Sequence, residues 1–141
     1  MRNLIYLLTV ILAFVVSSCS KSSSRHDREI SDAEDIMWSD ADSALRMLES
    51  IDPSELAEDS KYHYLVAYGH MRRNRSMVGD SLISFAHDYY RGKDVVRGVR
   101  SGMAFAWYKF WAGDTPGAIA MLDSLVGLPD VPDSIMVQTL R

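Results

Sequence analysis

The side chains best suited to metal binding or nucleophilic chemistry are three of the four histidines and the single cysteine, Cys19. His63 and His70 are seven residues apart, whereas metal ligands on one helix usually lie about three or four residues apart. His87 directly precedes Asp88, and adjacent side chains on a helix point away from each other. These spacings predict neither a metal site nor a histidine–carboxylate catalytic pair.

The rest of the sequence carries no recognisable catalytic motif. Its many serines do not form the G-x-S-x-G pattern of a nucleophile elbow. It also has no glycine-rich loop of the kind that cradles phosphate groups. We therefore expect a protein that is not an enzyme and that holds no cofactor and no metal.

Charged residues divide the chain into an acidic and a basic part. Residues 25–59 carry twelve acids and three bases, and residues 60–111 carry nine bases and three acids. Two interpretations remain open. The charges of packed helices compensate each other, or the basic part binds an acidic peptide or a lipid headgroup. The candidate patch consists of Arg72, Arg73, Arg75, Arg97 and Arg100. The net charge of −4 gives no reason to expect a nucleic-acid partner.

Aromatic residues gather in two segments, and both segments have a helical apolar pattern. The first holds Tyr62, Tyr64 and Tyr68, and the second holds Phe105, Trp107, Tyr108, Phe110 and Trp111. Because they cannot all face one core, most are expected to pack between helices and a few to line a groove for a peptide or sugar. The apolar stripe of the second segment is Val99, Met103, Ala106, Trp107 and Phe110. Tyr108 and Trp111 lie off this stripe and are the groove candidates.

The first 18 residues have the layout of a secretory signal peptide. Arg2 gives a positive start, residues 4–16 are apolar except for Thr9, and two serines follow. A membrane-spanning helix needs about 20 apolar residues, so this run is too short to span a bilayer comfortably. An N-terminal anchor that stays uncleaved is the alternative.

The tetrad Val16-Ser17-Ser18-Cys19 resembles the lipobox of bacterial lipoproteins, in which an aliphatic residue and two small residues precede a cysteine. The resemblance implies that the Cys19 thiol receives a diacylglyceryl group and that residues 1–18 are removed. It also implies that the new amino group is acylated, with palmitate as an expected chain. Several acyl chains anchor a protein firmly, whereas one chain binds only marginally.

The segment after this cysteine is expected to be a tether. Residues 19–28 start with a serine-rich stretch that contains no large apolar side chain, which is typical of a flexible linker. The serine-rich, basic stretch directly after Cys19 has no run of acids. This composition favours the periplasmic side of the outer membrane.

From about residue 29 onward the apolar residues follow a helical period, and no segment alternates as a strand would. A first helix, carrying Leu45, Leu48 and Ile51, stops at Pro53. Further helices are predicted at about 55–73, 78–90, 94–112 and 116–126. Asn74, Gly92 and Gly113 are the expected stops. The predicted fold class is all-α.

Three of these segments share a pattern at a nearly constant spacing. Ala44, Leu82 and Ala118 occupy equivalent positions, followed four residues later by Leu48, Ala86 and Leu122 and seven residues later by Ile51, Tyr89 and Leu125. The spacings of 38 and 36 residues lie just above the period of about 34 residues of a tetratricopeptide repeat. The stretch GDTPGAIAMLDSL resembles the second half of such a repeat most clearly.

This resemblance implies that residues 29–141 form antiparallel helical hairpins stacked as a short tetratricopeptide-like α-solenoid. Such stacks bury a continuous core and present extended concave surfaces. A last apolar pattern, with Ile135, Met136 and Leu140, is expected to cap the stack or to belong to an array that is incomplete at this end.

These features predict a membrane-anchored scaffold that binds a protein or peptide in the bacterial cell envelope. A sensory or regulatory module truncated from a longer signalling protein is one alternative. A component of a glycan-uptake assembly is another, since lipoproteins of such assemblies also contain repeats of this kind.

Overall fold

The computed structural model describes residues 23–128 and residue 131, and every regular element among them is helical. The elements are α2 (Ser23–Met37), α3 (Ala41–Glu49), the 3-10 helix η1 (Pro53–Leu56), α4 (Ser60–Arg72), α5 (Ile83–Tyr90), α6 (Val95–Trp111) and α7 (Thr115–Val126). The all-α prediction is therefore confirmed for the described part of the chain. None of these helices is long and apolar enough to cross a membrane.

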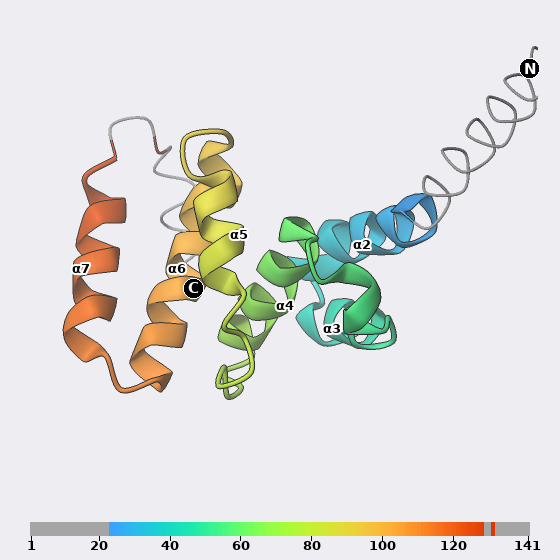
Figure 1. The fold of residues 1–141 in the computed structure, drawn as a ribbon, viewed down its shortest axis with the longest axis horizontal. Coiled ribbons are helices and arrows are strands. Elements are labelled where there is room, and N and C mark those ends of the chain that lie inside the picture. The colour runs from blue at the N-terminus through green and yellow to red at the C-terminus, as the bar shows by residue number, and fades with distance from the viewer. Residues whose placement is uncertain (1–22, 129–130, 132–141) are drawn as a thin grey trace, which may run out of the picture.

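The helices form an elongated stack in chain order. Figure 1 shows α2 and α3 at one end of the described part and α7 at the other, with α4, α5 and α6 between them. Each helix packs against the next one along the chain, and α4 also contacts both α2 and α6. The helices α2, α4 and α6 therefore adjoin one another across the stack, although α3 and α5 separate them in the sequence.

Aspartates begin four of these helices. Each accepts a hydrogen bond from the backbone N–H three residues later, at 2.9 to 3.0 Å, which satisfies one of the free donors of a first helical turn. These N-caps are Asp40, Asp59, Asp94 and Asp114. Asp52 caps η1 in a similar way, through the backbone N–H of Ser54.

The predicted stops after α4, α5 and α6 are confirmed. Asn74, Gly92 and Gly113 have backbone φ angles of 50°, 80° and 84°. This left-handed conformation ends a helix, and glycine and asparagine adopt it more readily than other residues. The bounds of α6 and α7 also agree with the prediction to within one residue.

Three other helix boundaries differ from the prediction. The first helical segment is two helices, because the chain turns after Met37 and Asp40 starts α3. The helix expected from residue 55 starts only at Ser60, since η1 occupies the residues after Asp52. The helix expected from residue 78 starts at Ile83.

The segments predicted for the two ends of the chain are only partly described. Because α2 begins at Ser23, residues 23–28 of the expected tether are helical instead. The predicted signal peptide, Cys19 and the apolar pattern of residues 135–140 lie outside the described residues.

The core runs through the stack from Ile30 in α2 to Ala104 in α6. Tyr64, Leu65 and Tyr68 of α4 are at most 1% exposed, so α4 lies at the centre of this core. In contrast, α7 buries only Ala118 and Leu125. Its outward face exposes Ile119, Leu122 and Val126.

The predicted apolar stripe of α6 is wrong at its C-terminal end. Trp107 and Phe110 are 37% and 52% exposed, whereas the buried face consists of Gly98, Val99, Ser101, Gly102, Ala104 and Ala106. Small residues let neighbouring helices approach closely, so they take the packing positions and leave the large rings outside. The repeat alignment likewise matches buried positions only in part, because Leu82, Tyr89 and Leu122 are exposed.

Candidate functional site

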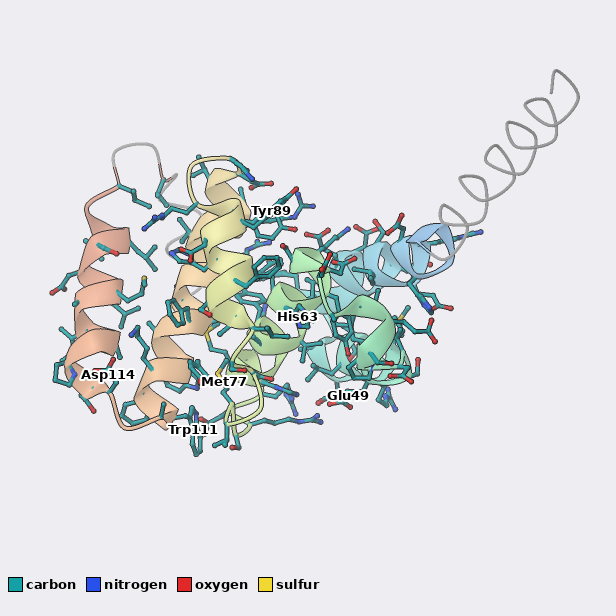
Figure 2. All side chains as sticks on the ribbon, in the orientation of Figure 1. Glu49, His63, Met77, Tyr89, Trp111 and Asp114 are labelled. Atoms are coloured by element: carbon teal, nitrogen blue, oxygen red, sulfur yellow. The ribbon has the colours of Figure 1, made fainter. Side chains whose placement is uncertain are left out.

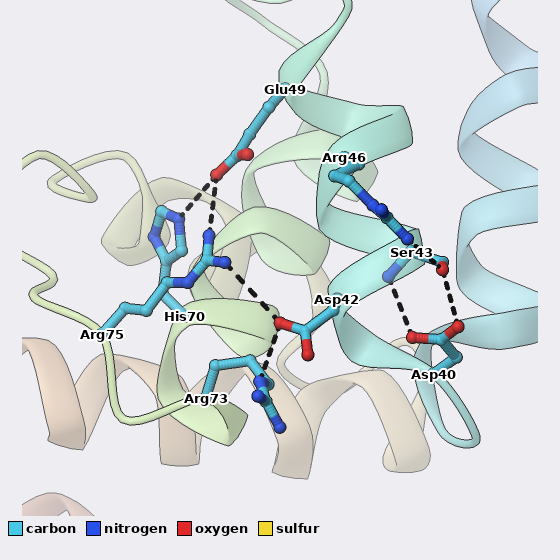
Figure 3. A network of polar contacts seen from close by, with 8 residues as sticks. All are labelled: Asp40, Asp42, Ser43, Arg46, Glu49, His70, Arg73 and Arg75. Carbon is cyan, nitrogen blue, oxygen red and sulfur yellow. Dashed lines mark hydrogen bonds and ion pairs between the residues drawn. The ribbon is translucent and has the colours of Figure 1, made fainter.

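Two of the five candidate arginines are paired with acids of α3. Arg73 Nε lies 2.8 Å from Asp42 Oδ1, and Arg75 Nη1 lies 3.3 Å from Glu49 Oε1. Figure 3 shows the network, in which His70 also contacts Glu49. These pairs are exposed, so each contributes little to stability, at most about 1 kcal/mol. They join the acidic and basic parts of the chain, as the charge-compensation interpretation predicted.

A third candidate, Arg97, binds the carboxylate of Glu34 on α2 with both ends of its guanidinium. Arg97 Nε donates to Glu34 Oε1 at 2.8 Å and Arg97 Nη2 to Glu34 Oε2 at 2.9 Å. Burial acts against ionisation of Glu34, but hydrogen bonds from Arg97 and Lys61 hold the pKa of this carboxyl below its usual value. Arg97 also donates to Asp94 at 2.9 Å. The pair of Arg97 and Glu34 therefore links α6 to α2.

The two remaining arginines lie against an aromatic ring. The guanidinium carbon of Arg72 is 4.2 Å from the ring centre of Trp38, and that of Arg100 is 5.3 Å from the same ring. Arg100 also lies 5.9 Å from the ring centre of Tyr68. Among the described residues, neither arginine forms an ion pair with a carboxylate. We call Trp38, Tyr68, Arg72 and Arg100 the Trp38 cluster.

Three polar atoms of the Trp38 cluster are buried without a hydrogen-bond partner. They are the Tyr68 hydroxyl, Arg72 Nη1 and Arg100 Nε, and no other buried side-chain nitrogen or oxygen of the described residues lacks a partner. Burial raises the pKa of Tyr68, and the positive charges of Arg100 and Arg72 oppose this shift. The guanidinium of Arg72 also lies close enough to the hydroxyl for a polar contact that opposes the shift, but the two groups do not meet the distance and angle of a hydrogen bond.

The Trp38 cluster is assembled from the three helices that adjoin across the stack. Trp38 directly follows α2, Tyr68 and Arg72 are one helical turn apart on α4, and Arg100 lies on α6. Residues four apart on a helix share a face, so Tyr68 and Arg72 point the same way. Sequence reasoning found Arg72 and Arg100 but missed Trp38, which lies in the turn between two helices.

The two aromatic groove candidates, Tyr108 and Trp111, differ in their surroundings. Tyr108 is half-buried, packs against the core and stacks on Phe105 with ring centres 6.3 Å apart. Trp111 is 40% exposed at the end of α6, close to the turn that leads to α7 (Figure 2). Tyr108 therefore has a packing role, and Trp111 remains an exposed aromatic residue outside the Trp38 cluster.

The three histidines considered above contact polar groups of other residues rather than each other. His63 Nε2 lies 3.2 Å from the backbone oxygen of Ala57, and His70 Nδ1 lies 2.7 Å from Asp80 Oδ2. This bond to Asp80 favours the charged imidazolium and raises the pKa of His70. Burial lowers the pKa of His87, whose Nδ1 lies 3.2 Å from Ser101 Oγ. In the part of the chain that the structure describes, no group of three or more His, Cys, Asp or Glu residues is arranged so that it could hold a metal ion.

A cavity of about 470 Å³ lies between the turn after α5, the start of α6 and the end of α7. Its walls include His87, Val99, Met121 and Leu125. The His87 imidazole is already engaged with Ser101, and the rest of the wall is largely apolar. Arg91, Lys93 and Asp94 also line the cavity. The Trp38 cluster differs from it in holding buried donors that lack acceptors among the described residues.

Comparisons with family models, curated proteins and solved structures found no match to this chain. Among the described residues, the Trp38 cluster is the site with the clearest capacity to bind a ligand.

Proposed function

We propose that this chain is a bacterial lipoprotein whose tetratricopeptide-like helical stack binds a protein or peptide in the cell envelope. The lipobox-like tetrad ending at Cys19 supports the anchor. The packing of each helix on the next, together with the contacts of α4 with α2 and α6, supports the repeat architecture. Stacks of this kind offer extended surfaces on which residues from several repeats meet.

The observation that carries the proposal is the composition of the Trp38 cluster. Trp38 is 37% exposed and has two guanidinium groups beside it, neither of them neutralised by an acid of the described chain. Tryptophan and arginine are the residues that most often dominate binding energy at protein interfaces. Since these residues come from the turn that directly follows α2, from α4 and from α6, a partner bound here would contact three neighbouring parts of the stack.

The binding role is tested by recovering the partner from membranes with the intact lipoprotein. We expect Trp38→Ala to lose a partner that the unchanged protein retains, because the ring and its two stacked arginines form the contact surface. Trp111→Ala is the matched control, since Trp111 is 40% exposed and lies outside the Trp38 cluster. Loss of the partner from Trp111→Ala but not from Trp38→Ala would place the binding surface at the end of α6.

The anchor is tested by feeding cells a labelled fatty acid. We expect Cys19→Ala to abolish both labelling and membrane fractionation, because the cysteine thiol is the acceptor that the lipobox resemblance implies. Ser20→Ala, one residue away, is the matched control and should be labelled normally. Continued labelling of Cys19→Ala in the membrane fraction would refute the lipoprotein interpretation.

A further inference from the structure

We infer that the Trp38 cluster is a binding site for a carboxylate group presented by a peptide. This inference rests on the proposed scaffold function and specifies the chemistry of its partner. Within the described residues, three buried donors of this cluster lack acceptors and its two positive charges lack counter-ions, and the exposed Trp38 ring lies over both guanidinium groups.

The unpaired buried atoms of the Trp38 cluster lower the stability of the unliganded protein. A buried polar atom that makes no hydrogen bond costs about 1–3 kcal/mol, more when the group is charged, and such atoms are few in folded proteins. Here the Tyr68 hydroxyl, Arg72 Nη1 and Arg100 Nε belong to one cluster. Their concentration at one place indicates a position that a ligand completes.

The donor pattern defines the ligand's chemistry. The two guanidinium nitrogens can only donate hydrogen bonds, and the tyrosine hydroxyl donates when it meets an acceptor. An ionised carboxylate is acceptor-only and has two oxygens, so it matches donors of these types and supplies the missing negative charge. Arg73, Arg75 and Arg97 already have carboxylates of this chain, which leaves Arg72 and Arg100 for an external one.

The Trp38 ring, which lies over the two guanidinium groups, favours a peptide rather than a lipid headgroup as the ligand. Arg72 and Arg100 are only half-buried, and the partly exposed Trp38 ring lies over both guanidinium groups. A small displacement of this ring would open the donors to a flat, slim carboxylate, whereas a tetrahedral phosphodiester needs a wider opening. Once displaced, the ring still offers an apolar surface to neighbouring side chains of a bound peptide.

The test uses the full lipidated chain in non-ionic detergent and four fluorescein-labelled octapeptides. Two peptides repeat Glu-Leu and two repeat Gln-Leu, and each sequence is made with a free and an amidated C-terminus. The amidated Glu-Leu peptide isolates side-chain carboxylates, and the free Gln-Leu peptide isolates the terminal one. At least one carboxylate-bearing peptide should bind about tenfold or more tightly than amidated Gln-Leu, as expected for charge-assisted hydrogen bonds.

Arginine-to-methionine variants locate the site. Arg72→Met and Arg100→Met keep an unbranched side chain but remove the donors, so each should abolish the preference for carboxylate. Arg73→Met is the matched control, because Arg73 is exposed and already paired with Asp42. Tyr68→Phe removes only the hydroxyl and should weaken carboxylate binding several-fold, which supplies a second test if a methionine variant does not fold.

Several results would overturn the inference. Equal binding of all four peptides would refute carboxylate recognition and leave the peptide scaffold intact, provided that Trp38→Ala abolishes this binding. If folded Arg72→Met and Arg100→Met variants kept the preference for carboxylate, the carboxylate would bind at another place on the protein. Binding to phosphatidylglycerol vesicles but to none of the peptides would refute the inference in favour of a lipid headgroup. If the protein bound neither the peptides nor the vesicles, this result would count against the inference and against the proposed function.

Discussion

Replacing Tyr64 with alanine should lower the free energy of unfolding by about 3–5 kcal/mol, the range seen when large aromatic residues are removed from protein cores. Tyr64 is 1% exposed on α4, and its ring lies 5.7 Å from that of Tyr68 and 5.8 Å from that of Tyr90 on α5. Burial also raises the pKa of Tyr64 well above its usual value, with Arg100 opposing the shift. Since small domains are stable by about 5–15 kcal/mol in total, this single change would remove a large part of the stability.

Urea or thermal denaturation monitored by helical circular dichroism measures this effect. Tyr64→Phe keeps the ring and should lose only about 1 kcal/mol, which separates packing from the hydroxyl. Tyr89→Ala is the matched exposed control, because Tyr89 is 48% exposed at the edge of the stack (Figure 2). If Tyr64→Ala were no more destabilising than Tyr89→Ala, α4 would not be the centre of the core.

Replacing Gly69 with valine should destabilise the protein by about 1–3 kcal/mol through overpacking. A Cβ atom at Gly69 would lie 2.7 Å from Leu45 Cδ2 and 3.2 Å from Met37 Cε, so side chains of α3 and α2 occupy the required space. Leu45 is fully buried, which leaves it little room to move away. Valine favours a helix over glycine by less than about 1 kcal/mol, so this gain in helix propensity cannot offset the clash.

A double-mutant cycle identifies the clash as the cause. Leu45→Ala alone should cost about 2–5 kcal/mol, but combined with Gly69→Val the loss should be smaller than the sum by about 0.5–3 kcal/mol. Gly79→Ala is the control glycine, since a Cβ atom there meets nothing within 4 Å, and it should change stability by no more than about 0.5 kcal/mol. Strict additivity of Gly69→Val and Leu45→Ala would contradict the close contact between α4 and α3.

The sequence predicts much of this fold because its local signals are strong. The glycines and asparagine that adopt positive φ angles end α4, α5 and α6, and the bounds of α6 and α7 follow from periodicity. The break before α3 has no proline or glycine to mark it, and it depends on the cap that Asp40 makes with Ser43. Asp40 and Asp59 were the missed signals, because they cap α3 and α4, whose starts periodicity alone did not locate.

Burial and the binding site could be predicted only in part. Periodicity assigned Trp107 and Phe110 to the buried face of α6, but small residues such as Gly102 occupy the interface because neighbouring helices approach closely there. Counting charges along the chain identified the five candidate arginines, but it could not tell which of them lack a carboxylate partner. Arg97 is neutralised by Glu34, which lies 63 residues away in the sequence and on another helix. Arg72 and Arg100 lie beside Trp38 because α2, α4 and α6 pack together in the fold, which charge counts cannot reveal.

The most direct test of the account is a crystal structure of the helical stack with the tighter-binding Glu-Leu or free Gln-Leu octapeptide. The account predicts carboxylate oxygens within hydrogen-bond distance, about 3 Å, of Arg72 Nη1 and Arg100 Nε, with the Trp38 ring displaced against the peptide. A peptide bound in the cavity beside His87 or along α7, with the donors of the Trp38 cluster still unpaired, would contradict it.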